Sequence, residues 1–422
     1  MLKRVEIPIT QYIIIGGGPA GATAALEIRG LDPEGEIALI SDENYQFYKR
    51  SKIINLVSAS CTEDDLFIKG KTLYEKNNIV FINNRVEGVY SEDKQVLLDN
   101  GTKINYDFLL IASGGSPLKL PMKDMDLEGV STLYSLDDAK HISEIACNVK
   151  NAVIIGGGST AMKAIQNFKK LGLNISIIEK SSHLWPIGFD RKVARIIEKK
   201  IEENGIHIYL NEEVVEFKGD NDKLTSVVLK NGKIVPAEIA VITIGIKPNI
   251  GFLENSGVKT EAGILVDENM RTNIPNIFAA GDVAQIFDPL YKKPILHPTW
   301  GNAKKQGRIA AVNMTGGNLA YKGVIPIQSI KIFGFTAIAV GITHSKKNFD
   351  EISWVSFEKE QCRKFVLKNN NLVGALVLGK NIDKKILKSL LKKAVSNQVN
   401  IDQYKALLLE ETLDFSALFD KS

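Results

Sequence analysis

Two glycine-rich turns of the same kind lie far apart in this chain, and each follows a short isoleucine-rich run. The first is Gly16-Gly17-Gly18-Pro19-Ala20-Gly21, and the second is Gly156-Gly157-Gly158-Ser159-Thr160-Ala161. One such turn is weak evidence, but two turns that each open a helical stretch predict a chain that binds two nucleotides. Proteins that hold two nucleotides usually pass electrons between them.

The first turn has the residues that a dinucleotide phosphate requires. Residues 12–15 form an uncharged, β-branched run, which is typical of a strand buried on both faces. Gly16 allows a tight turn, Gly18 lets the backbone approach a phosphate, and Gly21 lets the following helix pack closely on the strand. Pro19 and Ala20 belong to the start of the helix expected to about residue 29, whose N–H groups and dipole favour a pyrophosphate.

A second strand, expected over residues 37–40, ends at Ser41, Asp42 and Glu43. Asp42 follows Gly21 at about the 20-residue spacing expected of an acid that binds a ribose hydroxyl. The alternative is an ordinary strand–turn–helix whose glycines serve geometry alone. The agreement of strand, glycines, helix and acid favours the nucleotide site.

The second turn repeats this plan. A strand is expected over 152–155, a helix to about residue 171 and a strand over 174–178, followed by Glu179. Gly156 and Gly158 match the first two glycines, and Ala161 replaces the third while still permitting fairly close packing. Glu179 would accept bonds from a ribose and repel a 2′-phosphate, which favours NADH over NADPH. Alternatively, Glu179 merely caps a loop at a sheet edge.

Composition limits the remaining function classes. A chain of 422 residues suggests two or three domains, and its 44% hydrophobic and 24% charged residues are ordinary for a globular protein. No apolar run approaches the roughly 20 residues that span a bilayer, and no apolar signal core stands near Met1, so we expect a cytoplasmic protein. A net charge of +4, spread along the chain, does not indicate nucleic acid binding.

The three cysteines, Cys61, Cys147 and Cys362, are far apart and form no Cys-x-x-Cys motif. A metal centre or a dithiol relay is therefore not expected. Cys147 and Cys362 are interpreted as inert core thiols, and Cys61, in a polar loop, is the exception.

Three further strands are expected, and each ends in a loop that contains glycine. Residues 108–112 form a strand that ends in the loop Ser113-Gly114-Gly115, and residues 241–244 form a similar strand before Gly245. A strand over 276–280 ends in Gly281-Asp282, which we expect at the start of a helix.

Together these motifs resemble the FAD-dependent pyridine-nucleotide oxidoreductases, and most of all the NADH:rubredoxin reductases and the flavin modules of nitrite reductases. The resemblance covers nearly the whole chain. It implies an α/β fold with two Rossmann-like domains of the glutathione-reductase type and a small C-terminal α+β domain. It also implies FAD at the first turn and NADH at the second.

The resemblance assigns further residues to these cofactors. Asp282 matches an aspartate that bonds the ribityl chain, with Gly281 giving close backbone access. Ala112, Ser113 and Gly114 match an Ala-Thr-Gly loop beside the flavin, with serine in place of the usual threonine. The residues implied to bind FAD are Gly16, Gly18, Pro19, Ala20, Gly21, Asp42, Glu43, Arg50, Val86, Ala112, Ser113, Gly114, Gly281, Asp282 and Trp300. Those implied to bind NAD are Gly156, Gly158, Ala161, Glu179 and Gly245.

Arg50 and Trp300 are implied to lie at the flavin ring. Tyr48-Lys49-Arg50 resembles a Tyr-x-Arg segment, where a cation would stabilise negative charge on the reduced ring. The alternatives are a solvated Arg50, with Lys49 or Lys52 in its place, and a core Trp300. Trp300 precedes a helix expected over 302–314, whose N-terminal dipole would favour the same negative charge.

One residue departs from the pattern of the relatives. Many of them have a glutamate at the place of Lys163, near the flavin–nicotinamide contact. A buried cation that points to the flavin would destabilise the site unless an acid or a phosphate compensates its charge. A cation that points to solvent would have no such effect. This departure keeps open a flavoprotein subunit that does not oxidise NADH.

The layout predicted from these motifs has four parts. Residues 1–119 form the first part of the FAD domain, 120–245 the NAD domain, 246–320 the second FAD part and 321–422 the C-terminal domain. Such a C-terminal domain often carries a homodimer interface or covers the flavin. Its strands are expected near 329–333, 337–341, 351–357, 364–367 and 372–378, followed by two helices.

The expected C-terminal helices carry many lysines, which are Lys380, Lys384, Lys385, Lys388, Lys392 and Lys393. Leu387, Leu390, Leu391 and Ala394 fall at helical spacing, so the lysines share the polar side. This side is either a solvated face or a docking surface for a small acidic electron carrier such as rubredoxin.

The predicted reaction is hydride transfer from NADH to FAD, followed by one-electron transfer to a protein acceptor, with no protein acid or base. No residue is therefore predicted to be strictly catalytic. A disulfide reductase would need a redox cysteine, and a sulfide:quinone enzyme would need cysteines and a membrane-binding helix. The remaining alternative is a FAD electron-transfer subunit of a larger redox complex.

Overall fold

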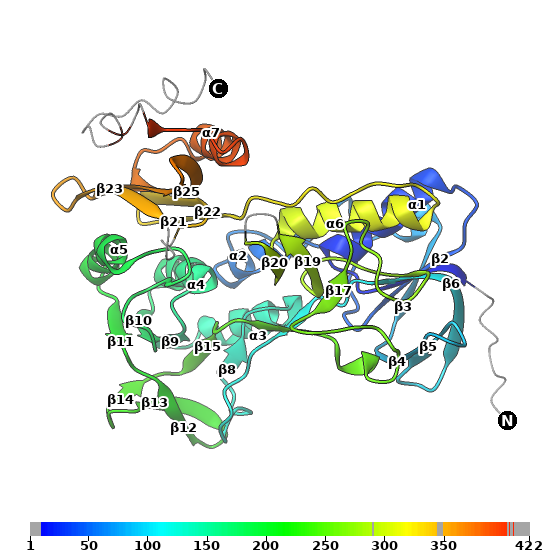
Figure 1. Cartoon of the computed structure of the whole chain (residues 1–422). Helices are drawn as coiled ribbons and strands as arrows, with labels where there is room; N and C mark the ends of the chain where they lie inside the picture. Colours follow the sequence, from blue (N-terminus) through cyan, green and yellow to red (C-terminus); the bar gives the residue numbers. More distant parts are fainter. Residues whose placement is uncertain (1–9, 289–290, 344–348, 403–404, 406–407, 409–422) are drawn as a thin grey trace. The chain divides into compact units, whose positions relative to one another are not determined.

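The computed structural model describes residues 10–288, 291–343, 349–402, 405 and 408. The chain divides into two compact units, whose elements are labelled in Figure 1. Unit 1 comprises residues 1–52, 62–116 and 246–324, and unit 2 comprises residues 53–61, 117–245 and 325–422. The four predicted domain boundaries remain a prediction.

Unit 1 is built on a seven-stranded sheet with the order β3-β2-β1-β6-β5-β4, to which β18 is added beside β6. Strands β1, β2, β3, β6 and β18 pair with one another in parallel, whereas β5 pairs with β6 in the antiparallel direction and β4 continues this antiparallel extension. The strands are β1 (Thr10–Ile15), β2 (Ile37–Ser41), β3 (Ile79–Asn83), β4 (Val86–Tyr90), β5 (Gln95–Leu98), β6 (Lys103–Ile111) and β18 (Ile277–Ala279).

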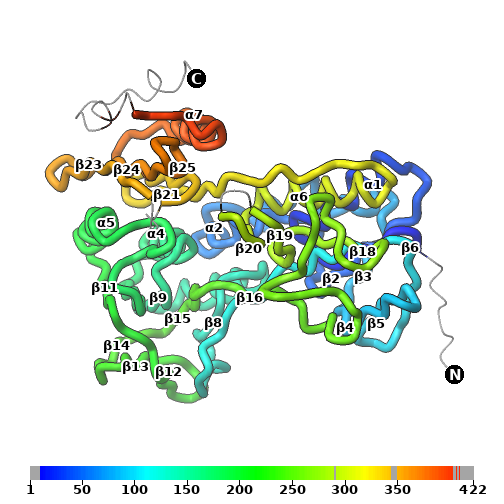
Figure 2. Tube along the Cα trace, viewed as in Figure 1, coloured from blue at the N-terminus to red at the C-terminus, as the bar shows by residue number. Residues whose placement is uncertain are grey.

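Two helices, α1 (Pro19–Leu31) and α6 (Trp300–Met314), lie side by side in unit 1, as Figures 1 and 2 show. Successive side chains of β1 point to opposite faces of the sheet, so Ile14 belongs to one apolar core and Ile13 to another. The helices join the core of Ile14, and α1 contributes a row of alanines whose small side chains allow close packing. The strand–turn–helix predicted here is confirmed.

Besides 3-10 helices such as Arg50–Lys52, the rest of unit 1 contains short strands. These are β7 (Gly115–Pro117) paired with β16 (Ile246–Pro248), and the set β17 (Ile264–Val266), β19 (Ala284–Asp288) and β20 (Lys293–Leu296). The helix predicted to begin at Gly281-Asp282 is wrong, because these residues form a turn between β18 and β19. The run Ala284–Asp288 is buried except for Phe287, as expected of a strand that pairs on both sides, and β17 and β20 satisfy its backbone.

Unit 2 contains the second parallel sheet, with the order β11-β10-β9-β15-β8. Its strands are β8 (Val130–Thr132), β9 (Asn151–Ile155), β10 (Asn174–Glu179), β11 (His207–Leu210) and β15 (Ile239–Ile242). Its helices are α2 (Ile54–Val57), α3 (Leu136–Ala146), α4 (Ser159–Lys170) and α5 (Arg191–Glu203). A small antiparallel sheet adds β12 (Val214–Asp220), β13 (Lys223–Leu229) and β14 (Ile234–Pro236). The two Rossmann-like folds predicted from the sequence are confirmed.

The C-terminal part of unit 2 is a five-stranded antiparallel sheet with the order β21-β22-β25-β24-β23, covered by α7. Its elements are β21 (Ile327–Ile332), β22 (Phe335–Gly341), β23 (Asp350–Ser356), β24 (Gln361–Lys368), β25 (Asn371–Lys380) and α7 (Lys384–Ser396). This is the predicted α+β domain. Lys380 was wrongly assigned to a helix, since it ends β25, and the second predicted helix falls mostly outside the described residues.

Candidate functional site

The first glycine turn permits no side chain at its outer positions. Gly16 has a φ of +109°, in the left-handed region, and a β-carbon built there would lie 2.2 Å from the Ala112 carbonyl oxygen. A β-carbon on Gly21 would lie 1.9 Å from the Gly16 carbonyl oxygen. The turn therefore brings the ends of β1 and β6 and the start of α1 together, as the sequence predicted.

The second turn repeats this geometry in unit 2 with more room. Gly156 has a φ of +99°, and a β-carbon there would lie 2.9 Å from the Thr243 carbonyl oxygen at the end of β15. Ala161, fully buried, stands where the first turn has Gly21. A methyl group thus fits between α4 and its strand, which explains why the third glycine is not needed here.

The glycine that directly precedes each helix, Gly18 or Gly158, faces open space. Gly18 and Gly158 cap α1 and α4 with extended backbone, at φ of −73° and −78°, and no atom of the described residues lies within 4 Å of a β-carbon built on either. Neither helix has an acidic residue in its first turn. Open backbone before a helix N-terminus without negative charge is the arrangement that binds a pyrophosphate. Both turns therefore fit a dinucleotide.

The acids at the ends of the second strands differ between the two sheets. In unit 2, the Glu179 carboxylate is buried and accepts the Gly157 N–H at 2.6 Å and the Ser181 N–H at 2.7 Å. In unit 1, the residue beside the glycine turn is Ser41, whose Oγ lies 3.4 Å from a β-carbon built on Gly17. Asp42 is the next residue and is exposed. Asp42 thus has its carboxylate available to a ribose, whereas Glu179 would share its carboxylate with backbone N–H groups.

Glu43, Tyr48 and Arg50 form one cluster in unit 1. The Glu43 carboxylate accepts from Arg50 Nη2 at 2.6 Å through Oε1 and from the Tyr48 hydroxyl at 2.6 Å through Oε2. The Arg50 guanidinium also lies over the Tyr48 ring, 5.1 Å from its centre. The Arg50 side chain is 24% exposed, so it is not the solvated loop cation considered as the alternative.

Asp282 lies at the turn after β18, near Arg50. Burial raises the pKa of Asp282 from 3.8 to about 6, and the charge of Arg50 opposes this rise. Gly281, with a φ of +88°, donates its N–H to Gln306 Oε1 of α6 at 2.7 Å. The fully buried Gln306 escaped the sequence reasoning, although the polar Gln306-Gly307 pair inside a helical pattern was a usable signal.

The loop after β6 is held by its own unit. Ser113 Oγ donates to the Asn249 carbonyl at 2.8 Å, and Asn249 Nδ2 donates to the Ser113 carbonyl at 3.0 Å. Gly114 follows with a φ of +63°. Ser113 therefore ties this loop to Asn249 through both its hydroxyl and its carbonyl. In unit 2, Gly245 has a φ of +120° and accepts the Leu118 N–H at 2.9 Å.

Trp300 is the first residue of α6 and is half-buried. Its ring stacks on Phe47, with centres 5.4 Å apart and planes 6° apart. The preceding His297 pairs with the buried Asp288 at 2.6 Å, and its carbonyl accepts from Asn302 Nδ2 at 3.1 Å, which fixes the start of the helix. Val86 begins β4 and is buried.

Lys163 lies on α4, in the second turn of that helix, and is half-buried rather than solvent-exposed. Burial lowers the pKa of Lys163, and repulsion from Lys384 of α7 lowers it further. Lys163 is therefore partly withdrawn from solvent, and whether it points to the flavin stays a prediction. Among the cysteines, Cys362 is buried as expected, but Cys147 is exposed at the end of α3 and is no core thiol.

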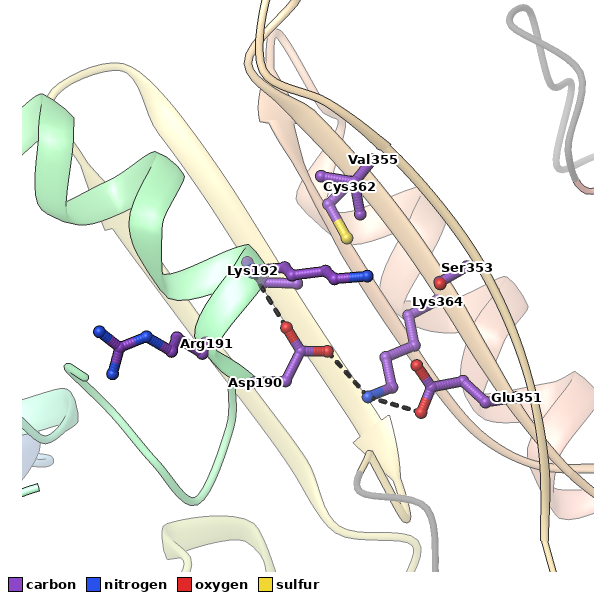
Figure 3. A pocket seen from close by; sticks show the side chains of 9 residues that line it. Asp190, Arg191, Lys192, Glu351, Ser353, Val355, Cys362 and Lys364 are labelled. Carbon is purple, nitrogen blue, oxygen red and sulfur yellow. Dashed lines mark hydrogen bonds and ion pairs between the residues drawn. The ribbon is translucent and has the colours of Figure 1, made fainter. Parts of the chain in front are cut away.

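A cavity of about 350 Å³ lies in unit 2 between the start of α5 and the strands β23 and β24 (Figure 3). Lys364 crosses it, and its Nζ lies 2.9 Å from carboxylate oxygens of both Asp190 and Glu351. Asp190 also caps α5 by accepting the Val193 N–H. None of the predicted cofactor-binding residues lines this cavity, and the ion pairs fasten β24 to α5.

In the described part of the chain, no three His, Cys, Asp or Glu side chains lie close enough together to hold a metal ion. Nor is any described helix both long and apolar enough to cross a bilayer. The cytoplasmic location expected from the sequence remains a prediction.

Two Rossmann-like folds, each with an open glycine turn, define a flavoprotein oxidoreductase of the two-dinucleotide class. Residues 10–313 match the family described as pyridine nucleotide-disulphide oxidoreductase, and residues 326–395 match the rubredoxin NAD+ reductase C-terminal domain. The chain belongs to the pyridine nucleotide-disulphide oxidoreductase family. The family is one of flavoprotein reductases, and the matches assign FAD and NADH to this chain as cofactors.

Similar proteins and a similar solved structure support the assignment to this family. The NADH-rubredoxin oxidoreductase of Clostridium acetobutylicum is 30% identical over 94% of this chain and 97% of its own length. A solved structure of that organism's NADH:rubredoxin oxidoreductase has a TM-score of 0.79 and 28% identity, covering 98% of this chain and 100% of the other. The Bacillus subtilis nitrite reductase is 26% identical over 91% of this chain, which spans 47% of that protein. The resemblance inferred from the motifs is confirmed.

Proposed function

We propose that this chain passes electrons from NADH through FAD to a small acidic carrier protein of the rubredoxin kind, without a redox-active disulfide. The observation that carries the proposal is the match of residues 326–395 to the rubredoxin NAD+ reductase C-terminal domain. The full-length similarity to an NADH-rubredoxin oxidoreductase supports it. FAD, when bound, supplies the exchange between two-electron and one-electron chemistry.

The chain's own residues bind and orient the cofactors. In unit 1, Gly18 and the N-terminus of α1 receive a pyrophosphate, and Asp42 and Asp282 accept sugar and ribityl hydroxyls. Arg50 and Trp300 would lie at the flavin ring. In unit 2, Gly158 and Glu179 do the same for NADH, with Glu179 selecting against a 2′-phosphate. The remaining predicted binding residues, apart from Glu43, keep the roles that the resemblance implies.

The cysteines support a route without a disulfide. Burial raises the pKa of the Cys362 thiol to about 12, so this thiol is not a nucleophile near neutral pH. Cys147 is exposed at the end of α3, and Cys61 lies in the loop that follows α2. The three cysteines belong to separate segments, and none lies in the helix that follows either glycine turn.

The carrier is proposed to be acidic because of α7. Lys384, Lys385, Lys388, Lys392 and Lys393 are exposed there, while Leu387, Leu391 and Ala394 are buried on the opposite side. A cationic helix face attracts an acidic partner at long range and speeds the encounter. We keep this docking face as part of the proposal.

The test is anaerobic reduction. NADH added to the FAD-loaded protein is expected to bleach the flavin absorbance, and oxidised rubredoxin added next is expected to restore it. NADPH at the same concentration should bleach more slowly. A flavin that stays oxidised with NADH would contradict the proposal.

A second candidate is an electron-transfer subunit that receives electrons from another protein. The half-buried Lys163, at a place where the resemblance implies a glutamate, favours it. One relative is named as such a subunit. It is the assimilatory nitrate reductase electron transfer subunit of Bacillus subtilis, which is 26% identical over 91% of this chain. The same NADH experiment separates the two candidates.

A further inference from the structure

Glu43 is held by two short hydrogen bonds from its own segment of chain. Its Oε1 accepts from Arg50 Nη2 at 2.6 Å, and its Oε2 accepts from the Tyr48 hydroxyl at 2.6 Å. The Glu43 side chain is 23% exposed, and Tyr48 is buried. Both oxygens are thus engaged by donors on the turn that carries Arg50, and a charge-assisted bond of this length fixes the guanidinium.

The Arg50 guanidinium also interacts with a second carboxyl group. Its charge favours the ionised form of Asp282 across the turn after β18. One arginine therefore serves two acids, of which Glu43 makes the direct ion pair. Partial burial strengthens this pair relative to one in water.

We propose that Glu43 is a positioning residue that fixes Arg50 and offsets part of its charge, and that it does not bind the FAD ribose. The geometry separates it from Asp42, its neighbour in sequence, which is exposed and available to the sugar. The proposal rests on the function above only in that Arg50 faces the flavin ring.

The consequence concerns the reduction potential of the flavin. A cation beside the ring stabilises the negative charge of the reduced form, and an anion bonded to that cation weakens the effect. Glu43 then lowers the potential that Arg50 alone would give. A ribose ligand, in contrast, would change the affinity for FAD and leave the potential nearly unchanged.

The test compares Glu43→Gln with Glu27→Gln in the FAD-loaded full chain. Glu27 pairs with Arg308 at 3.0 Å in the same unit, so the control removes a similar charge from a similar ion pair. The midpoint potential is measured by titration with a chemical reductant, and the dissociation constant of FAD by fluorescence. E43Q is expected to shift the potential in the positive direction with a Kd within about threefold of the wild type. E27Q should shift neither.

Two results would overturn the inference. One is an unchanged potential in E43Q, and the other is a Kd raised tenfold or more without a shift in potential. If E43Q does not fold, Tyr48→Phe serves instead. This variant removes the hydroxyl that donates to Glu43, so the Glu43 carboxylate interacts with Arg50 alone. The potential should then shift in the negative direction, and any other result contradicts the inference.

This titration uses neither NADH nor a carrier protein. A protein that holds FAD but is not reduced by NADH would contradict the proposed function and still permit the comparison. A wild-type protein that takes up no FAD would contradict both.

Discussion

Gly307 of α6 lies so close to Ala20 of α1 that a β-carbon at position 307 would stand 2.2 Å from the Ala20 carbonyl oxygen. The carbonyl belongs to the first turn of α1, directly after the open backbone of Gly18. Glycine inside a 15-residue helix is otherwise unfavourable by about 1 kcal/mol relative to alanine. The close approach of two backbones explains why glycine stands here, and it ties α6 to the start of α1.

Gly307→Ala should therefore destabilise unit 1 and displace the start of α1. Overpacking in a fixed core typically costs 1–3 kcal/mol, so we expect a loss of about that size, with weaker FAD binding. Urea unfolding and FAD titration measure the two effects. Gly301→Ala is the matched control, because Gly301 lies in the same helix with no described atom within 4 Å of its β-carbon position. Equal stability of G307A and G301A would contradict the packing argument.

Gly18 and Gly158 offer a matched pair of substitutions. Alanine fits both positions in the folded chain, because the backbone is extended and the space is open. The added methyl group would instead meet a bound phosphate. We expect G18A to weaken FAD binding by at least about tenfold and G158A to raise the Kd for NADH by a similar factor.

Each variant is the control for the other. Calorimetry on the two proteins should show unchanged melting temperatures before cofactor is added. G158A should retain its FAD, and G18A reconstituted with excess FAD should bind NADH normally. The assignment of the two turns fails if G158A loses its flavin while G18A keeps it.

Asp282 predicts a pH dependence of the protein without FAD. Burial raises the pKa of this carboxyl to about 6 from 3.8, so between these values the folded chain holds a proton that the unfolded chain has released. The free energy of unfolding should therefore fall as pH rises from about 4 to about 6 and level off above. The full shift corresponds to about 3 kcal/mol.

Asp282→Asn removes this titration. Urea unfolding of both proteins without FAD, from pH 4 to 7, should show a smaller decline in the variant and greater stability than the wild type at pH 7. FAD should reduce the decline in the wild type, because ribityl hydroxyls would donate to the ionised carboxylate. Parallel pH profiles for wild type and D282N would be the contrary result.

Elements with strong local signals could be predicted from the sequence. The run at Ile13 and Ile14 and the turn at Gly16 require only β-branched burial and glycine geometry, which act within a few residues. The turn at Asp282 could not be predicted this way. The strand β19 that follows this turn is stabilised by pairing with β17 and β20. Because these partners are not adjacent to the turn itself, the local sequence alone resembled a helix start.

The site shows the same limit. Asp42 and Glu43 are adjacent acids, and sequence spacing alone cannot say which one faces a ribose. The bond from Arg50 to Glu43 occupies one carboxylate and leaves the other exposed, and this difference is the reason why we propose Asp42 for the ribose. Lys163 could be recognised as a departure, but its proximity to Lys384 depends on how the C-terminal sheet packs within unit 2.

The lysines of α7 give a prediction about the partner. Replacing Lys384, Lys388 and Lys392 with glutamine removes three positive charges from the exposed face while the buried Leu387 and Leu391 keep the helix packed. Reduction of rubredoxin should slow at low ionic strength, and the difference should vanish as salt screens the field over about 10 Å at 0.1 M. Stopped-flow rates across a salt series measure both effects.

A second triple variant controls for net charge. Lys218, Lys223 and Lys230 are equally exposed, on the small sheet of β12 and β13, and their replacement by glutamine changes the total charge by the same amount. NADH-driven bleaching of the flavin should be unaltered in the triple of Lys218, Lys223 and Lys230. It is measured separately in the α7 triple, because Lys384 lowers the pKa of Lys163 on α4. If the two triples slow the carrier equally, net charge rather than the α7 face attracts it, and the docking surface must lie elsewhere.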